Sequence, residues 1–226
     1  MIIDESADLR EAVPAAVQSA FGYSGQKCSA LSRLIVHNKV YDTFVESFLQ
    51  AAETISLGDP VDYQNSMGPV IDDAAQQKIR EYIEIGKKEA TLVYQSAAPE
   101  EGYYIPKTIF VDVPPDAVIA REEIFGPVVA IIRANTLDEA LDIANNTDYA
   151  LTGGMFAADP AALERAKNEF LVGNLYLNRS ITGAVVQRQP FGGFKMSGAG
   201  TKQGGVHYLE NFLFLRTITE KIVDGT

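Results

Sequence analysis

The 226-residue sequence has little of the residue types that build disulfides and metal sites. It holds one cysteine, Cys28, two histidines, His37 and His207, and no tryptophan. A single cysteine excludes an intramolecular disulfide, and a structural zinc site would lack thiolate ligands. Because the two histidines are far apart in the sequence, we predict no metal site.

Basic residues are also scarce. The 19 lysines and arginines face 30 aspartates and glutamates, which gives a formal net charge of −11. An acidic surface repels phosphate backbones and anionic headgroups, so we expect no nucleic-acid or membrane partner. No apolar run approaches the roughly 18 residues of a membrane span, and the start, MIIDESADLREAV, lacks the basic region of a signal peptide. These features favour a cytoplasmic protein.

Buried strands alternate with amphipathic helices along most of the chain. Residues 40–55 and 72–90 carry apolar side chains at helical spacing. Residues 128–132 form the continuous apolar run of a strand that is covered on both faces, and Thr136 begins a capping box. We predict an α/β fold, a mainly parallel twisted sheet flanked by helices, with a C-terminal oligomerisation strand at residues 212–222.

The first residues raise two further expectations. Met1 leads directly into Ile2-Ile3-Asp4, which resembles the end of a buried strand, so we expect the chain to be part of something longer. Pro14 interrupts the helical pattern of residues 7–21. Because proline lacks the N–H of a helix interior, we expect a kink or a helix start there.

Cys28 has two interpretations when only its neighbours are considered. A lone cysteine is more often a small buried hydrophobic residue than a nucleophile. However, Cys28 follows a polar turn with Gly22 and Gly25, and Lys27 precedes it. A nearby cation and free backbone N–H groups are typical of reactive cysteines, so a nucleophile and a structural thiol both stay open.

Four ordered sequence blocks resemble the aldehyde dehydrogenase family. They are FGYSGQKCSA at 21–30, EEIFGP at 122–127, GNLYLN at 173–178 and PFGGFKMSG at 190–198. The resemblance covers essentially the whole chain and begins after the family's glutamate-containing segment. It implies a cysteine-bearing catalytic domain at residues 1–205 and a helical turn with an oligomerisation strand at 206–226. It also implies that the N-terminal NAD-binding domain is absent.

By this resemblance, Cys28 is the catalytic nucleophile that attacks an aldehyde carbon, and NAD is the cofactor that accepts the hydride. Glu123 would bind the nicotinamide ribose, and Phe125 would pack near the nicotinamide. Without the motif, Glu123 would be a solvated acid and Phe125 a core aromatic. The family's general base and most of its NAD contacts lie in the absent segment, and Glu5 is not a substitute base.

Ser29, the loop Gly183-Ala184 and Phe191 resemble the substrate site of the 1-pyrroline-5-carboxylate (L-glutamate γ-semialdehyde) dehydrogenase branch. In that branch the serine hydroxyl and two backbone N–H groups hold a carboxylate remote from the aldehyde, and the phenylalanine packs on the aliphatic chain. The implied reaction is NAD-dependent oxidation of L-glutamate γ-semialdehyde to L-glutamate in proline catabolism. A plain glycine turn is the alternative for residues 182–186.

The missing base and nucleotide domain predict that the chain is inactive alone. Its partners would be a small substrate with a carboxylate and either further copies of the chain or a complementing N-terminal half. Two other functions stay open. One is a non-catalytic module that binds another chain by strand addition through residues 212–222. The other is a different semialdehyde dehydrogenase, such as a CoA-acylating enzyme, against which Ser29 and Gly183-Ala184 argue.

Overall fold

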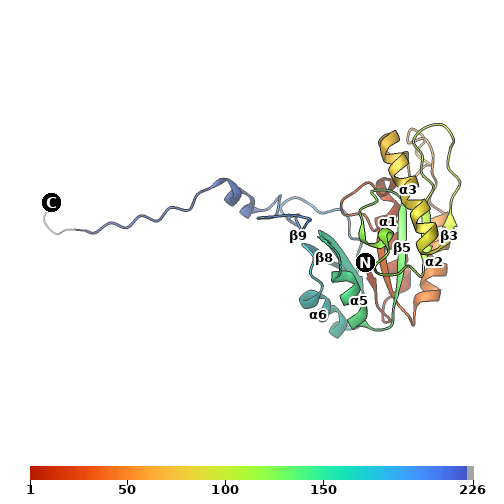
Figure 1. Ribbon diagram of the computed structural model, residues 1–226. Coiled ribbons are helices and arrows are strands. Elements are labelled where there is room, and N and C mark those ends of the chain that lie inside the picture. Colours follow the sequence, from red (N-terminus) through yellow and green to blue (C-terminus); the bar gives the residue numbers. More distant parts are fainter. Residues whose placement is uncertain (223–226) are drawn as a thin grey trace.

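The computed structural model describes residues 1–222, which form a three-layer α/β body and a C-terminal arm (Figure 1). A seven-stranded sheet is the middle layer, and all its neighbouring strands are parallel except β3 and β4. The mainly parallel α/β fold is therefore confirmed. From edge to edge the strands are β3 (Thr91–Gln95), β4 (Thr108–Val111), β5 (Val128–Ala134), β2 (Arg33–His37), β1 (Ile2–Ile3), β7 (Thr152–Phe156) and β8 (Asn174–Leu177).

Strand β1 lies inside this sheet, between β2 and β7, although it has only two residues. Ile2 pairs with Ile35 of β2 on one side and with Met155 of β7 on the other. Alternate side chains of a strand point to opposite faces, and Ile2 and Ile3 accordingly enter the two different hydrophobic cores. The expectation of a buried strand at the start of the sequence is confirmed.

Helices cover both faces of the sheet. The core that contains Ile3 packs under α1 (Leu9–Phe21) and α2 (Tyr41–Glu53). The core that contains Ile2 packs under the other four helices, α3 (Asp73–Glu89), α4 (Val118–Arg121), α5 (Leu137–Asn145) and α6 (Pro160–Glu169). None of the helices within residues 1–222 has the length and apolar character needed to cross a bilayer.

Helices α1, α3, α5 and α6 begin after a residue whose side chain accepts a backbone N–H, whereas α2 and α4 have no such cap among the described residues. Asp72 accepts a hydrogen bond from the Ala75 N–H at 2.8 Å, and Thr136 accepts one from the Glu139 N–H at 3.1 Å. The prediction for Pro14 was wrong where it allowed a helix start, because α1 runs through the proline from Leu9. Burial of its apolar face keeps the helix continuous despite one missing backbone hydrogen bond.

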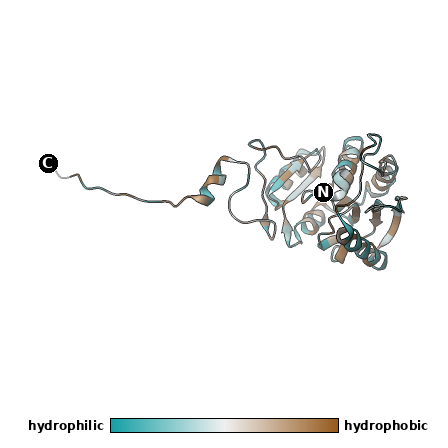
Figure 2. Cartoon of the chain, turned by 90° about the horizontal axis from the view of Figure 1, so that it is seen from above, coloured by the Kyte–Doolittle hydropathy of each residue, from teal (hydrophilic) through white to brown (hydrophobic). Residues whose placement is uncertain are grey.

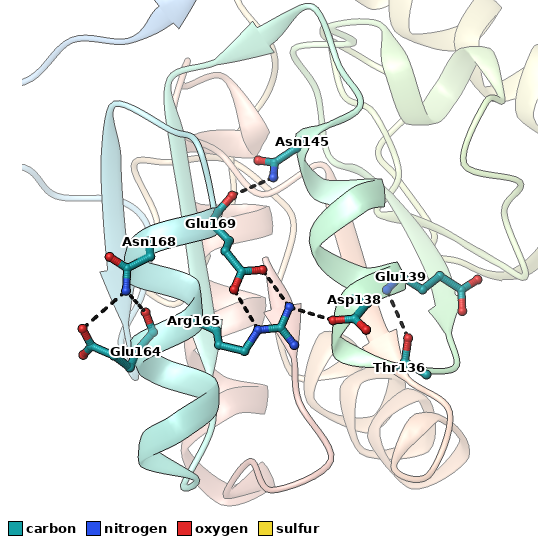
Figure 3. Close-up of polar contacts among 8 residues, drawn as sticks. All are labelled: Thr136, Asp138, Glu139, Asn145, Glu164, Arg165, Asn168 and Glu169. Carbon is teal, nitrogen blue, oxygen red and sulfur yellow. Dashed lines mark hydrogen bonds and ion pairs between the residues drawn. The ribbon is translucent and has the colours of Figure 1, made fainter.

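Arg165 joins α6 to α5 (Figure 3). Its guanidinium contacts Glu169 of the same helix at 2.8 and 2.7 Å and Asp138 of α5 at 2.7 Å. Asn145, the last residue of α5, donates to the Glu169 carbonyl at 2.7 Å and accepts from the Leu171 N–H at 2.9 Å. These contacts fix the loop after α5, which leads toward the candidate site.

The C-terminal arm leaves the body as the long blue segment of Figure 1. It starts with the 3₁₀ helix η2 (Val206–Phe212), so the prediction of a strand from Phe212 was wrong at that residue. Residues 213–222 pair with no strand within the described chain, because pairing needs a neighbouring strand that the body does not bring there. Brown patches mark apolar residues here in Figure 2, and Phe214 and Leu215 are fully exposed. Residues 223–226 of the predicted C-terminal segment lie outside the described residues.

Candidate active site

Cys28 is exposed and follows a turn with an unusual backbone just before β2. In η1 (Gly22–Gly25), Tyr23 and Ser24 have φ values of 57° and 56°, and Gly25 has 71°. Left-handed backbone is costly for residues with a side chain. The alternative of Cys28 as a buried structural thiol is wrong, since its side chain is open to solvent.

Two side chains tether this turn to the loop before α3. The Ser24 hydroxyl, which is buried, donates to the Gly68 carbonyl at 2.8 Å. The Gln26 side-chain carbonyl accepts from the Ile71 N–H at 2.9 Å. A strained backbone conformation persists only where surrounding contacts hold it in place. These two hydrogen bonds are such contacts.

The turn packs against the loop that carries Glu123 and Phe125. A Cβ on Gly25 would overlap the carbonyl of Gly126, so both the φ value and the close approach require glycine. Phe125 itself has φ 61°, and its side chain is 41% exposed. The alternative of a core aromatic at position 125 is therefore wrong.

Helix α3 supports the same loop from its other side. Lys78 Nζ donates to the Glu123 carbonyl at 2.9 Å. The Tyr82 hydroxyl donates to the Glu122 carboxylate at 2.6 Å, and this hydrogen bond to an anion raises the pKa of Tyr82 to about 12. Tyr82 therefore stays protonated, and holds this hydrogen bond, throughout the neutral range.

Cys28, Glu123 and Phe125 line one cavity of about 320 Å³. Much of its wall comes from segments just before β2, β5 and β7, so the cavity lies at the amino edge of the parallel strands. Within residues 1–222 the Glu123 carboxylate has no hydrogen-bond or ion-pair partner among the side chains and backbone groups. An open carboxylate, an exposed ring and a thiol fit a ligand with hydroxyl groups and a flat ring.

Glu5 has a different environment. Its carboxylate forms an ion pair with Lys39, and within the described chain Glu5 is not part of the cavity wall. The carboxylates that do line the cavity among the described residues are Glu122 and Glu123. Glu122 already accepts the Tyr82 hydroxyl, so Glu123 is the one open to a ligand.

The four predicted substrate residues are not brought into this cavity within the described chain. Ser29, which directly follows Cys28, is buried. Gly183 has φ 84°, and an added Cβ would meet nothing within 4 Å, so the space beside it is open; Ala184 follows it. Phe191 is half-buried, and its backbone exchanges hydrogen bonds of 2.8 and 2.9 Å with Gln203. Their convergence on one substrate stays a prediction.

Sequence reasoning missed Ser19, which connects the two groups of residues. The Ser19 carbonyl accepts from the Leu31 N–H, three residues after Cys28, at 2.9 Å. The Ser19 hydroxyl accepts from the Ile181 N–H, two residues before Gly183, at 3.2 Å. An isolated serine in an amphipathic helix belongs to no motif, so only the structure could find it.

The last two sequence blocks pack on each other. The Asn174 side chain donates to the Pro190 carbonyl at 3.0 Å and accepts from the Gly192 N–H at 3.3 Å. A Cβ on Gly173 would overlap the Gly192 carbonyl. The glycines of these blocks thus serve close backbone packing.

A second, two-stranded sheet holds the end of the last block. Strand β9 (Phe194–Lys195) pairs antiparallel with β6 (Tyr149–Ala150). Lys195 Nζ donates to the carbonyls of Asn145 and Thr147 at 2.7 and 2.8 Å, which binds the block to the end of α5.

A family model described as "Aldehyde dehydrogenase family" matches residues 1–218. The chain belongs to the aldehyde dehydrogenase family. Among curated aldehyde dehydrogenases, the 1-pyrroline-5-carboxylate dehydrogenases of Oceanobacillus iheyensis and Bacillus subtilis are each 49% identical to it, over 98% and 97% of this chain. The chain spans 43% of the length of each of these relatives.

Solved structures of the family share the fold. Proline utilization A (PutA) from Bdellovibrio bacteriovorus, inactivated by N-propargylglycine, superposes with a TM-score of 0.92 at 54% identity, covering 93% of this chain and 22% of that one. A 1-pyrroline-5-carboxylate dehydrogenase from Thermus with bound NAD superposes with a TM-score of 0.90 at 49% identity, covering 93% of this chain and 41% of that one.

Proposed function

We propose that this chain is the nucleophile-bearing part of an enzyme that uses NAD to oxidise L-glutamate γ-semialdehyde, the open form of 1-pyrroline-5-carboxylate, to L-glutamate in proline catabolism. The observation that carries the proposal is the joint placement of an exposed Cys28, Glu123 and Phe125 around one cavity. The names of relatives at about half identity support the substrate.

Cys28 is the nucleophile in this proposal. Its sulfur forms a bond to the aldehyde carbon, and the electron pair of the C=O double bond moves to oxygen, where the Cys28 backbone N–H donates to the developing charge. NAD, when bound, accepts the hydride that leaves the former aldehyde carbon. Water then cleaves the thioester to release the acid and restore the thiol.

Glu123 and Phe125 hold the cofactor's nicotinamide half. The open Glu123 carboxylate accepts hydrogen bonds from ribose hydroxyls, and the exposed Phe125 ring packs beside the nicotinamide. Helix α3 keeps both in place through Lys78 and Tyr82.

Ser29, Gly183, Ala184 and Phe191 bind the other end of the substrate. The Ser29 hydroxyl and the two backbone N–H groups of the loop donate to the carboxylate, and Phe191 packs on the methylene groups between the two ends. The open space beside Gly183 supports this role, because a carboxylate can approach its N–H.

Residues 1–205 act as the catalytic domain and residues 206–226 as the assembly segment. The family's base and most NAD contacts are expected outside this chain, so we propose that it is inactive alone and works with a nucleotide-binding half. That half is supplied either in the same assembly or by another chain. The reaction is placed in the cytoplasm, because the nucleophile must stay a reduced thiol.

The test is NADH formation from NAD and pyrroline-5-carboxylate in three samples: the chain, the chain with the N-terminal part of the Bacillus subtilis relative, and the same mixture with Cys28→Ala. We expect turnover only in the second sample. Turnover that persists in Cys28→Ala would contradict the proposal, as would a folded mixture that binds NAD and stays inactive.

The exposed arm favours one further function, that of an assembly module without chemistry. Phe214 and Leu215 are fully exposed, which is unusual for large apolar side chains. Light scattering distinguishes the two functions when it is combined with the NADH assay. A self-associating chain that never supports turnover with a nucleotide-binding half would favour the module.

A further inference from the structure

Ser19 is a fully buried serine on α1 that the proposed chemistry does not use. Its hydroxyl donates to the Ala15 carbonyl at 2.7 Å and accepts from the Ile181 N–H at 3.2 Å. Its own carbonyl accepts from the Leu31 N–H at 2.9 Å. One residue therefore fixes a helix, the segment after the nucleophile and the segment before the Gly183 loop.

We propose that Ser19 is a positioning residue that sets the separation between the Cys28 sulfur and the carboxylate-binding loop at Gly183-Ala184, and so selects the length of the substrate. This inference rests on the proposed function. A substrate held at one end by a carboxylate presents its aldehyde to the sulfur only if the two sites are correctly spaced. Misplacement by about 1 Å costs on the order of 100-fold in rate.

The two connections of Ser19 use different atoms. The link toward Cys28 runs through the Ser19 backbone carbonyl, and the link toward Gly183 runs through the side-chain hydroxyl. Ser19→Ala therefore keeps the first and removes the second. The Ile181 N–H loses its partner, and the loop that follows is released while the cysteine turn keeps its contact.

Cys28 gives a direct readout because it is the single thiol of the chain. We would measure its alkylation by iodoacetamide through the mass shift of the intact chain, with increasing L-glutamate, the proposed product, as a protecting ligand. The Ser19→Ala variant should need about tenfold more glutamate for half protection than the parent, because the released loop loses pre-organisation. Its alkylation rate without glutamate should change by less than about twofold, since the backbone link to Leu31 remains.

Two variants separate positioning from general damage. Ser96 makes matched contacts far from the site, since its hydroxyl donates to the Ala97 carbonyl at 3.0 Å and accepts from the Lys107 N–H at 3.0 Å. Glutamate should protect Cys28 in Ser96→Ala as well as it does in the parent. Ser19→Thr keeps the hydroxyl, which in a helix can still reach the preceding turn, but adds a methyl group to a fully buried site. We expect it to unfold at a lower temperature and still be protected by glutamate nearly as the parent is.

The outcomes are distinguishable. If glutamate protects Cys28 in Ser19→Ala as well as it does in the parent, the proposed role of Ser19 is wrong while the substrate site stands. The same conclusion follows if Ser19→Thr and Ser19→Ala weaken this protection equally. If glutamate fails to protect the folded parent, the proposed substrate site is wrong, and the inference about Ser19 fails with it. Weaker protection in Ser19→Ala, restored by threonine, supports it.

Discussion

At the scale of single residues, the turn before Cys28 and the loop of Phe125 contain strained backbone. Tyr23, Ser24 and Phe125 all have positive φ values, each of which costs roughly 1–2 kcal/mol for a residue with a side chain. Ser24 is held by its hydrogen bond to Gly68. Such strain is typical of functional sites, where the position of a reacting group matters more than local stability.

Gly25 and Gly22 offer a matched test of this close packing. Gly25→Ala places a Cβ against the Gly126 carbonyl at φ 71° and should lower the free energy of unfolding by about 3 kcal/mol. Gly22 has φ −56°, and a Cβ added there would meet nothing within 4 Å. Gly22→Ala should therefore change the free energy of unfolding by less than about 0.5 kcal/mol. Chemical denaturation measures both, and equal effects would contradict the packing argument.

Tyr82 gives a prediction that depends on pH. Tyr82→Phe removes the hydrogen bond to Glu122 and should lower the free energy of unfolding by about 1 kcal/mol at pH 7, a value reduced for its partial exposure. The folded-state pKa of Tyr82 is raised to about 12 by that bond. The stabilisation is therefore fully present below the ordinary tyrosine pKa of about 10 and is lost as pH rises through about 12.

Denaturation curves of the parent and Tyr82→Phe, taken from pH 7 to 11, check this sign. The difference between the two should be constant up to about pH 9 and shrink above about pH 10. Tyr63→Phe is the control, because Tyr63 is 91% exposed. A difference that grows with pH would show that the hydrogen bond does not stabilise the folded state.

Which residues the sequence could predict depends on how local their signals are. Cys28, Glu123 and Phe125 lie inside contiguous motifs, so the sequence proposed them, and the structure brings them to one cavity. Ser19 and Tyr82 act through partners 162 and 40 residues away. No pattern in a single sequence encodes such pairs, because the contact exists only after the fold has formed.

At the scale of elements, the helices expected at residues 40–55 and 72–90 were predicted closely, whereas strands β6 and β9 were not predicted. Caps such as Thr136 are local and readable. Strands β6 and β9 have two residues each and exist only through their mutual pairing. The position of the cavity also departs from a general rule. Ligands of open α/β sheets usually bind at the carboxyl ends of the strands, whereas this cavity lies at their amino edge.

Lys107 is a buried lysine that satisfies backbone carbonyls at the end of α2. It is 2% exposed, and its ammonium donates to the carbonyl of Ala52 at 2.7 Å and to that of Ile55, at the end of α2. Burial lowers the pKa of Lys107. Lys107→Met keeps the apolar stem but leaves these carbonyls unsatisfied, and should lower the free energy of unfolding by about 2 kcal/mol.

Thermal unfolding of Lys107→Met, beside Lys88→Met as the control on the exposed face of α3, measures this effect. The control should unfold like the parent, since an exposed lysine contributes little. If Lys107→Met is as stable as the parent, the buried ammonium costs as much in desolvation as its hydrogen bonds return.

At the scale of the whole molecule, the body and the arm differ in what they bury. The two hydrophobic cores contain no residue of the arm, which instead exposes several large apolar side chains. The body should therefore be stable without it, while the arm needs a partner surface. An arm of this kind is a ready template for strand pairing with another chain.

Truncation to residues 1–205 tests this division. The truncated chain should unfold at the same temperature as the parent when both are measured as monomers, and it should lose any self-association seen by light scattering. The double variant Phe214→Asp, Leu215→Asp should behave like the truncation, because two charges on fully exposed apolar positions oppose burial in an interface. Association that survives both changes would assign assembly to the body.

The position of β1 between β2 and β7 has a consequence for how the chain folds as it leaves the ribosome. Ile3 pairs with Phe156 of β7, so the residues of β1 wait for a partner strand that is synthesised much later in the chain. At a synthesis rate of about 5–20 residues per second, that wait is on the order of 10 s. Until then β1 has no β7 beside it, and the nascent chain keeps an apolar strand edge open to chaperones or to neighbouring nascent chains.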